Sequence, residues 1–320
     1  MRIEKDALGE MPLPDGAYYG IQAFRSLSNF DVTDKTFNDY PAVVRALAEI
    51  KKACALANRD IGALGADKAG AIARACDDIL EGRMEGQFPV NIWRGGGTSI
   101  NMNLNEVIAN RANELLTGHK GYEQVHPNTH VNMCQSSNDV YPTAENIVLY
   151  RETGRALEGV AALENSFARK SKEFGGVVRL GRTCLQDGVP MTLGQVFAGF
   201  HGVIRRSRER LEALREGFRV GVLGGTVIGT GLGVLPGYVE AVYPHLSAIV
   251  GFEMRLPDTP EGSPVSDAGL FDAMQNADGL LTLSGALKVL ACSAGKIAND
   301  FRLLSSGPRS GFGEIRLPAV

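Results

Sequence analysis

The stretch HPNTHVNMCQSSNDVYPT, residues 126–143, followed by the helical pattern of residues 144–160, decides how the chain is organised. Its small hydrogen-bonding side chains are denser than packing alone requires. Ser137, Asn138 and Asp139 stand where a helix N-cap belongs, and Pro142 stands in a permitted first-turn position.

At such a helix start, free backbone N–H groups and the positive end of the helix dipole meet serine and asparagine side chains. The stretch therefore predicts the start of a helix and a place suited to a carboxylate or a phosphate. The alternative is a helix cap preceded by an ordinary polar loop.

Composition excludes several classes of function. The chain has 320 residues, 44% of them apolar, and a net charge of −3 from 33 basic and 36 acidic residues. This balance gives no electrostatic footprint for nucleic acid or an anionic membrane. The five cysteines are odd in number, widely spaced and without a CxxC pair, which favours a reduced, cytoplasmic setting with neither disulfides nor a zinc site. No secretory signal is expected at the N-terminus.

One uncharged stretch could be mistaken for a membrane span. Val220–Val239 is free of charged residues and has a glycine at every fourth position from Gly221, which formally matches a pattern of paired membrane helices. Its seven glycines leave too little large apolar surface, and glycine disfavours helix. We expect a glycine-rich connection here.

Helical periodicity predicts an all-α fold. Helices are expected at residues 41–61, 67–83, 100–117, 139–174, 189–219 and 267–304, residues 1–40 are expected to form an irregular arm, and no strand is expected. Residues 1–138 would form a small N-terminal helical domain, and residues 139–320 a long-helix bundle domain. Three long helices from one chain make a thin bundle, which predicts burial against neighbouring subunits.

The polar clusters limit the chemistry. The chain contains no HExxH, no cysteine–histidine ligand set, no Gly-x-Ser-x-Gly and no nucleotide-binding loop, so metal and cofactor chemistry is not supported. The remaining Thr, Ser and Asn side chains at loop–helix junctions can stabilise negative charge that develops on a substrate oxygen. A dicarboxylic acid that loses a proton beside one carboxylate would develop such a charge, as an enediolate.

Five segments in collinear order make the chain recognisable. They are GTSINMNLNEVIANR (97–111), residues 126–143, GRTCLQDGVPMTLGQ (181–195), GGTVIGTGL (224–232) and KIANDFRLLSSGPR (296–309). Together they resemble the aspartase/fumarase superfamily, and most closely its aspartate ammonia-lyase branch. The resemblance implies an all-α fold and a homotetramer in which loops of three subunits build each active site. It also implies reversible, cofactor-free elimination of ammonia from L-aspartate to give fumarate.

The resemblance also assigns roles to individual residues. Thr98, Ser136 and Ser137 would bind the β-carboxylate and its enediolate form. Asn138 and Thr183 would face the leaving amino group.

Two further parts of the substrate-binding set follow from the same resemblance. Cys184 adjoins Thr183, at a position where fumarases have histidine and aspartases have histidine or glutamine. His126, Asn128 and Thr129 resemble a secondary anion-binding segment of fumarases, and a merely hydrogen-bonded loop is the alternative.

The chain departs from the family pattern in ways that leave alternatives open. The flexible loop GSSxMPxKxNP, which supplies the serine base in the family, would begin where the sequence reaches Val320. We therefore expect residues 1–320 to be part of a longer polypeptide and to be inactive alone. RGGGTS is one residue shorter than the usual QGGAGTS, which affects the reach of Thr98. The alternatives are a class II fumarase, another amino-acid lyase of the superfamily, or a catalytically incomplete assembly partner.

Overall fold

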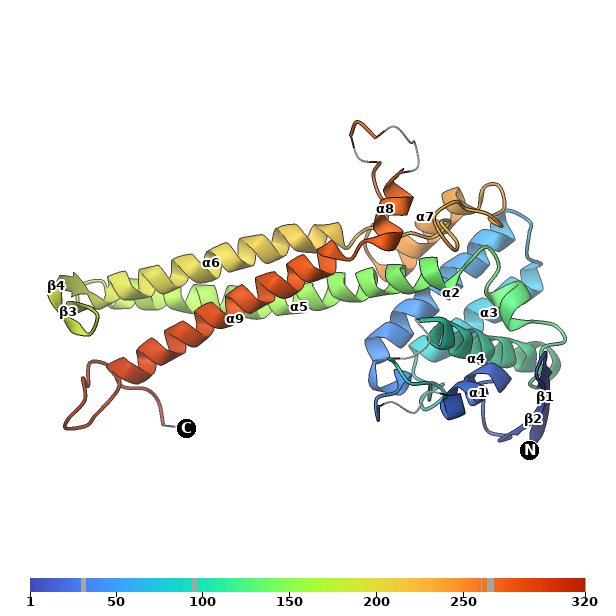
Figure 1. Ribbon diagram of the computed structural model, residues 1–320, viewed down its shortest axis with the longest axis horizontal. Coiled ribbons are helices and arrows are strands. Elements are labelled where there is room, and N and C mark those ends of the chain that lie inside the picture. Colours follow the sequence, from blue (N-terminus) through green and yellow to red (C-terminus); the bar gives the residue numbers. More distant parts are fainter. Residues whose placement is uncertain (30–32, 94–96, 260, 264–267, 320) are drawn as a thin grey trace. The chain divides into compact units, whose positions relative to one another are not determined.

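The computed structural model describes residues 1–29, 33–93, 97–259, 261–263 and 268–319. It divides into two compact units. The first combines Met1–Leu149 with Phe218–Asn276, and the second combines Tyr150–Gly217 with Ala277–Val320. The return of residues 218–276 to the first unit was not foreseen from the sequence. The predicted all-α class is confirmed, because long helices dominate both units (Figure 1).

The first unit begins with a hairpin and a helix in place of the expected irregular arm. Strands β1 (Arg2–Asp6) and β2 (Gly9–Leu13) pair antiparallel, and α1 (Ile21–Asn29) follows. The buried carboxylate of Glu106 accepts hydrogen bonds from the backbone N–H groups of Gly20, Gln22 and Ala23, at 2.8–3.0 Å. A side chain more than 80 residues away therefore caps this helix, and a local sequence pattern cannot reveal such a cap.

Four helices of the first unit agree closely with predicted ones: α2 (Pro41–Asp60), α3 (Ala66–Leu80), α4 (Thr98–Thr117) and the start of α5 (Ser137–Glu173). Helix α7 (Tyr238–Val250) and the short turns η1 (Phe37–Asp39) and η3 (Pro127–Val131) were not predicted, and α8 (Ala268–Gln275) was predicted only as part of a longer helix. Helix α2 packs against both α3 and α7 and buries Leu47, Ile50 and Cys54 in the core. Pro142 lies inside α5, in its second turn, because the helix begins earlier than predicted.

The second unit contains the rest of α5 together with α6 (Leu193–Gly217) and α9 (Asp278–Leu304), which lie side by side in Figure 1. A cluster of phenylalanine rings joins the three helices. Ring centroids of Phe167, Phe197, Phe200 and Phe301 lie 5.5–6.3 Å apart. Such aromatic contacts stabilise a bundle beyond the burial of their area.

Two predicted elements of the second half were wrong. The connection at 181–190 is an antiparallel hairpin of β3 (Val178–Thr183) and β4 (Gln186–Thr192), so α6 begins at Leu193 and not at residue 189. Strand β3 is mostly half-buried and β4 mostly exposed, and neither shows an apolar alternation that would predict it. The helix predicted at 267–304 is two helices, α8 and α9. The break falls at residues 276–277, and α9 begins with Asp278 and Gly279, so Asn, Asp and Gly cluster where a continuous helix is disfavoured.

The glycine-rich connection is confirmed and is anchored to the start of α5. Residues 221–237 form turns up to the beginning of α7. The Asp139 carboxylate accepts hydrogen bonds from the N–H groups of Ser136 (2.9 Å) and Thr226 (3.0 Å), and Thr143 Oγ1 accepts one from Val222 N (3.0 Å). Asp139 therefore fixes both the loop before α5 and the glycine-rich connection.

One helix of the described residues, α9, is long and apolar enough to cross a membrane by length and composition alone. Only 17% of its most apolar window is buried within the chain. These criteria do not distinguish a membrane span from a helix that packs against other helices in a bundle.

The buried Asp139 predicts a pH-dependent contribution to stability. Burial raises its pKa from 3.8 to about 7, against the opposing effect of its backbone donors and of Lys51. The folded state thus binds this proton more tightly than the unfolded state, so the group's contribution to stability falls as pH rises from 3.8 to about 7. Asp139→Asn does not titrate. The stability advantage of the native chain over this variant, measured by urea unfolding, should shrink across that window by on the order of 4 kcal/mol at most. A difference that stays constant with pH would contradict the shift.

Candidate functional site

The starts of α4 and α5 lie side by side in the first unit. Gly97 caps α4 with φ at +83°, and a Cβ there would lie 3.0 Å from Cγ of Tyr141 on α5. Both the left-handed backbone and the close contact require glycine at this position. Asn101, in the first turn of α4, donates from Nδ2 to Oγ of Ser137 at 3.1 Å. Thr98 and Ser137 are therefore the first residues of two neighbouring helices, where backbone N–H groups lack partners within the helix.

A buried cation lies beneath this pair of helix starts. The Lys51 side chain is fully buried, and its Nζ donates to Oδ1 of Asn132 (2.9 Å) and Oε1 of Gln135 (2.8 Å). Burial lowers its pKa to about 8. Asn101 Nδ2 also donates to Asn132 Oδ1 at 3.1 Å, so hydrogen bonds run from Lys51 through two amides to the Ser137 hydroxyl. The buried Asp139 opposes this lowering of the pKa, and a further anion near Lys51 would do the same, because charge separated from water is otherwise costly.

The residues around Ser137 combine capping with availability for a ligand. Ser136 Oγ accepts from Asn138 N at 3.2 Å, and Asp139 accepts from Ser136 N, so these side chains cap the start of α5. Asn138 donates from Nδ2 to the carbonyl oxygen of Val227 in the glycine-rich connection, at 2.8 Å. The cap and the anion-binding interpretation of this stretch are therefore compatible. Capping uses Ser136 Oγ as an acceptor, and its hydroxyl hydrogen stays available to donate.

The secondary segment at His126 is a hydrogen-bonded turn. His126 Nδ1 accepts from the N–H groups of Asn128 and Thr129, both at 3.2 Å, and so caps η3. His130 Nδ1 accepts from His126 N at 2.8 Å. Asn128 and Thr129 are exposed, and their proposed anion-binding role stays a prediction.

The second unit carries the other predicted substrate-binding residues. Thr183 ends β3, and Cys184 follows it in the turn of the hairpin, where both are exposed. The structure places them within their own unit only, so their meeting with Thr98 and Ser137 stays a prediction. Residues 94–96, which precede Thr98 in the RGGGTS segment, lie outside the described residues.

Sequence reasoning missed Lys51 and Asn101. A signal for Lys51 was present, since it follows Leu47 by four residues on the buried face of α2, where a lysine disrupts an otherwise apolar stripe. Asn101 and Asn105 are likewise spaced by four on α4, and both are buried. Across the described residues, no group of three or more His, Cys, Asp or Glu side chains could hold a metal ion.

Comparisons with known proteins cover almost the whole chain. A family model described as "Lyase" matches residues 9–320. An aspartate ammonia-lyase from Bacillus sp is 43% identical over 100% of this chain and 66% of its own length. A class II fumarate hydratase from Ralstonia nicotianae is 43% identical over 99% of this chain and 67% of its own length.

Solved structures agree with these matches. The fumarate lyase:delta crystallin of Brucella melitensis has a TM-score of 0.93 at 46% identity and is covered over 68% of its length by 100% of this chain. A class II fumarase from Schistosoma mansoni has a TM-score of 0.88 at 35% identity, with 97% of this chain and 66% of that chain covered. The chain thus spans about two thirds of the length of its relatives. It belongs to the lyase family that contains the aspartate ammonia-lyases and the class II fumarate hydratases.

Proposed function

We propose that this protein is an aspartate ammonia-lyase, which converts L-aspartate reversibly to fumarate and ammonia without a cofactor. The observation that carries the proposal is the meeting of two helix starts, those of α4 and α5, above the buried Lys51. Hydroxyl groups, helix dipoles and one buried cation act in the same direction there, toward an anionic group.

This arrangement suits the charge that develops during the elimination. Removal of the proton beside the β-carboxylate would turn that group into an enediolate with a second negative charge. The hydroxyls of Thr98, Ser136 and Ser137 would hold this form more strongly than the ground-state carboxylate. Donors fixed in advance accelerate a reaction when they bind the developing charge more tightly than the substrate.

The amino end of the substrate would meet residues of a different kind. Asn138 and Thr183, with Cys184 beside it, would face the leaving group. Family resemblance assigns the proton-abstracting base to a serine in the GSSxMPxKxNP loop, and residues 1–320 contain no such segment. The proposal therefore takes the base from outside these residues.

Exposed apolar side chains on α9 support the proposed homotetramer. Leu281 is 73% exposed, and Leu287 and Val289 are also exposed on the same helix. Apolar surface of this kind is typically buried by association. Assembly would also allow loops of different copies to share one active site. All five cysteines are free, which is consistent with the proposed reduced, cytoplasmic setting.

A class II fumarase, which would eliminate water from malate, is the second candidate. It is favoured by class II relatives as similar in sequence as the aspartate ammonia-lyases. Cys184 argues against it, because the family resemblance places the histidine of fumarases at this position.

Substrate choice provides the first test. A chain that carries the family's serine loop should release fumarate from L-aspartate, measured by ultraviolet absorbance, and should do so with a higher kcat/KM than from L-malate. A higher kcat/KM for malate would support the fumarase candidate and contradict the proposal.

Removing a single donor provides the second test. Ser137→Ala in the same chain should cost about 2 to 4 kcal/mol of transition-state stabilisation, seen as a lower kcat/KM for aspartate. Ser28→Ala is a matched control, because Ser28 is an exposed serine of the first unit whose hydroxyl donates to the carbonyl of Arg25 in α1. Equal rates for the two variants would remove Ser137 from the site.

A further inference from the structure

The turn that carries Cys184 has an unusual backbone. Cys184 and Leu185 connect β3 to β4, and their φ angles are +49° and +62°. Two-residue hairpin turns of this kind favour Asn and Gly, because residues with a Cβ are disfavoured in the left-handed region. Such a conformation persists only when surrounding contacts hold it.

The C-terminal segment contacts β3, the strand that leads into this turn. Glu314 lies between two arginines of β3, with Oε1 2.5 Å from Arg182 Nη1 and Oε2 3.0 Å from Arg179 Nη2. The side chains of Arg179, Arg182 and Glu314 are only 12%, 19% and 20% exposed. Charge-assisted contacts that are partly shielded from water hold geometry better than freely exposed ion pairs.

The two arginines flank an irregularity in the strand. Pairing of β3 with β4 shifts register between Leu180 and Arg182, so Arg179 precedes the irregularity and Arg182 follows it. A β-bulge re-aims the side chains beyond it. Glu314 binds an arginine on each side of this register shift. It therefore fixes the direction of β3 from the shift to Thr183.

The segment that presents Glu314 is itself fixed to the end of α9. Glu314 N donates to the carbonyl oxygen of Leu304 at 2.9 Å, and Gly313 N donates to that of Ser306 at 2.8 Å. The Arg182 guanidinium also lies 4.3 Å from the ring centroid of Phe312, a cation–π contact.

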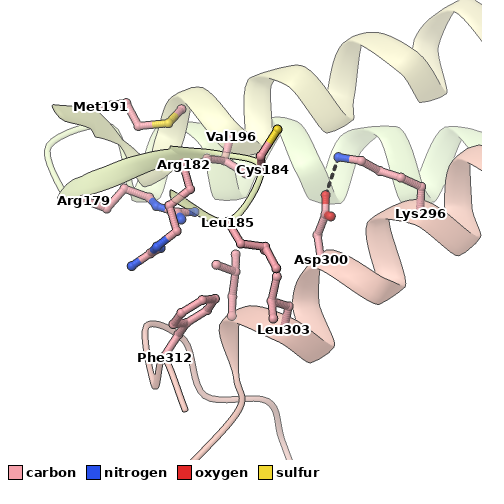
Figure 2. A pocket seen from close by; sticks show the side chains of 11 residues that line it. Arg179, Arg182, Cys184, Leu185, Met191, Val196, Lys296, Asp300, Leu303 and Phe312 are labelled. Atoms are coloured by element: carbon pink, nitrogen blue, oxygen red, sulfur yellow. Dashed lines mark hydrogen bonds and ion pairs between the residues drawn. The ribbon is translucent and has the colours of Figure 1, made fainter. Parts of the chain in front are cut away.

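A cavity of about 390 Å³ lies at the hairpin turn and the end of α9. Figure 2 shows residues of the turn, Cys184 and Leu185, lining it together with Leu303 and Phe312. The turn is therefore closed by the pairing of Thr183 with Gln186, and the strand that leads into it is held by the arginine–glutamate contacts.

We propose that Glu314 is a positioning residue for the substrate-binding segment Thr183–Cys184. The inference rests on the proposed function, which assigns Thr183 to the leaving amino group. Glu314 acts through Arg179 and Arg182 and does not itself touch the substrate. Through these two arginines, the C-terminal segment sets the conformation of the hairpin turn and therefore the position of Thr183 relative to the substrate.

Local hydrogen exchange tests this role without relying on activity. In the 320-residue chain, Glu314→Gln should speed amide exchange of peptides covering residues 178–192 about tenfold, because the charge that orders both arginines is lost. Exchange in α6 and in the middle of α9 should stay unchanged. Arg179→Gln should reproduce the effect from the other side of the contact, and Glu314→Asp, which keeps the charge on a shorter side chain, should show a smaller one.

Glu164→Gln is the matched control. Glu164 bridges Arg208 (2.6 Å) and His201 (3.5 Å) in the same unit, with a similarly shielded side chain. This variant should leave exchange at 178–192 unchanged. Wild-type hairpin exchange in both Glu314→Gln and Arg179→Gln would overturn the proposal, and so would equal acceleration throughout the second unit.

Kinetics separate this inference from the proposed function. In a chain that carries the serine loop, Glu314→Gln should lower kcat for aspartate about tenfold, while Glu164→Gln should not. Faster hairpin exchange with an unchanged kcat would overturn the positioning role. If the unsubstituted enzyme released no fumarate, the proposed function would fail, whereas the exchange data would still decide whether Glu314 orders the hairpin.

Discussion

One hydrogen bond, from Asn101 Nδ2 to Ser137 Oγ, joins the first turns of two helices whose starts are 39 residues apart in sequence. Two helix starts placed together concentrate positive electrostatic potential, and Lys51 adds a formal charge beneath them. Lys51 already has the amide oxygens of Asn132 and Gln135 as partners, and an anion at the helix starts would add a favourable interaction with its charge. The same network therefore accounts for both the local structure and the proposed preference for a dicarboxylate.

The elements that could be predicted from the sequence are those with a local signal, either capping residues or helical spacing of apolar residues. The start of α5 was predictable because SSND carries capping chemistry, and α2, α3 and α4 were predictable because their apolar residues repeat with helical spacing. Helices α1 and α7 of the same unit were not predicted. The hairpin at 178–192 was missed, since its strands lack alternation and its turn uses Cys184 and Leu185 where Asn and Gly would be expected. Lys51 was missed as a site residue because its partners, Asn132 and Gln135, are about 80 residues away. Only the folded chain brings them together.

In the proposed active site, the two units supply different groups. The first unit would supply the anion-binding helix starts, which hydrogen bonds of Asp139 and Asn101 fix in place. The second unit supplies Thr183 on an exposed hairpin that owes its shape to contacts with the C-terminal segment. If subunits share their loops as the family resemblance implies, the helix starts of one subunit would be completed by the β3–β4 hairpin of another. The conformation of that hairpin would be set by the C-terminal segment of its own subunit. Holding groups in a productive geometry is a major source of rate acceleration, so control of this hairpin would be control of the reaction.

The most direct measurement of the central claim is a crystal structure of the assembled enzyme with fumarate bound. We expect one carboxylate of fumarate within about 3.2 Å of the hydroxyl groups of Thr98 and Ser137, at the starts of α4 and α5. Thr183 from a neighbouring copy should lie beside the same ligand. Fumarate bound away from these helix starts, or Thr183 remote from the ligand in every copy, would contradict the account.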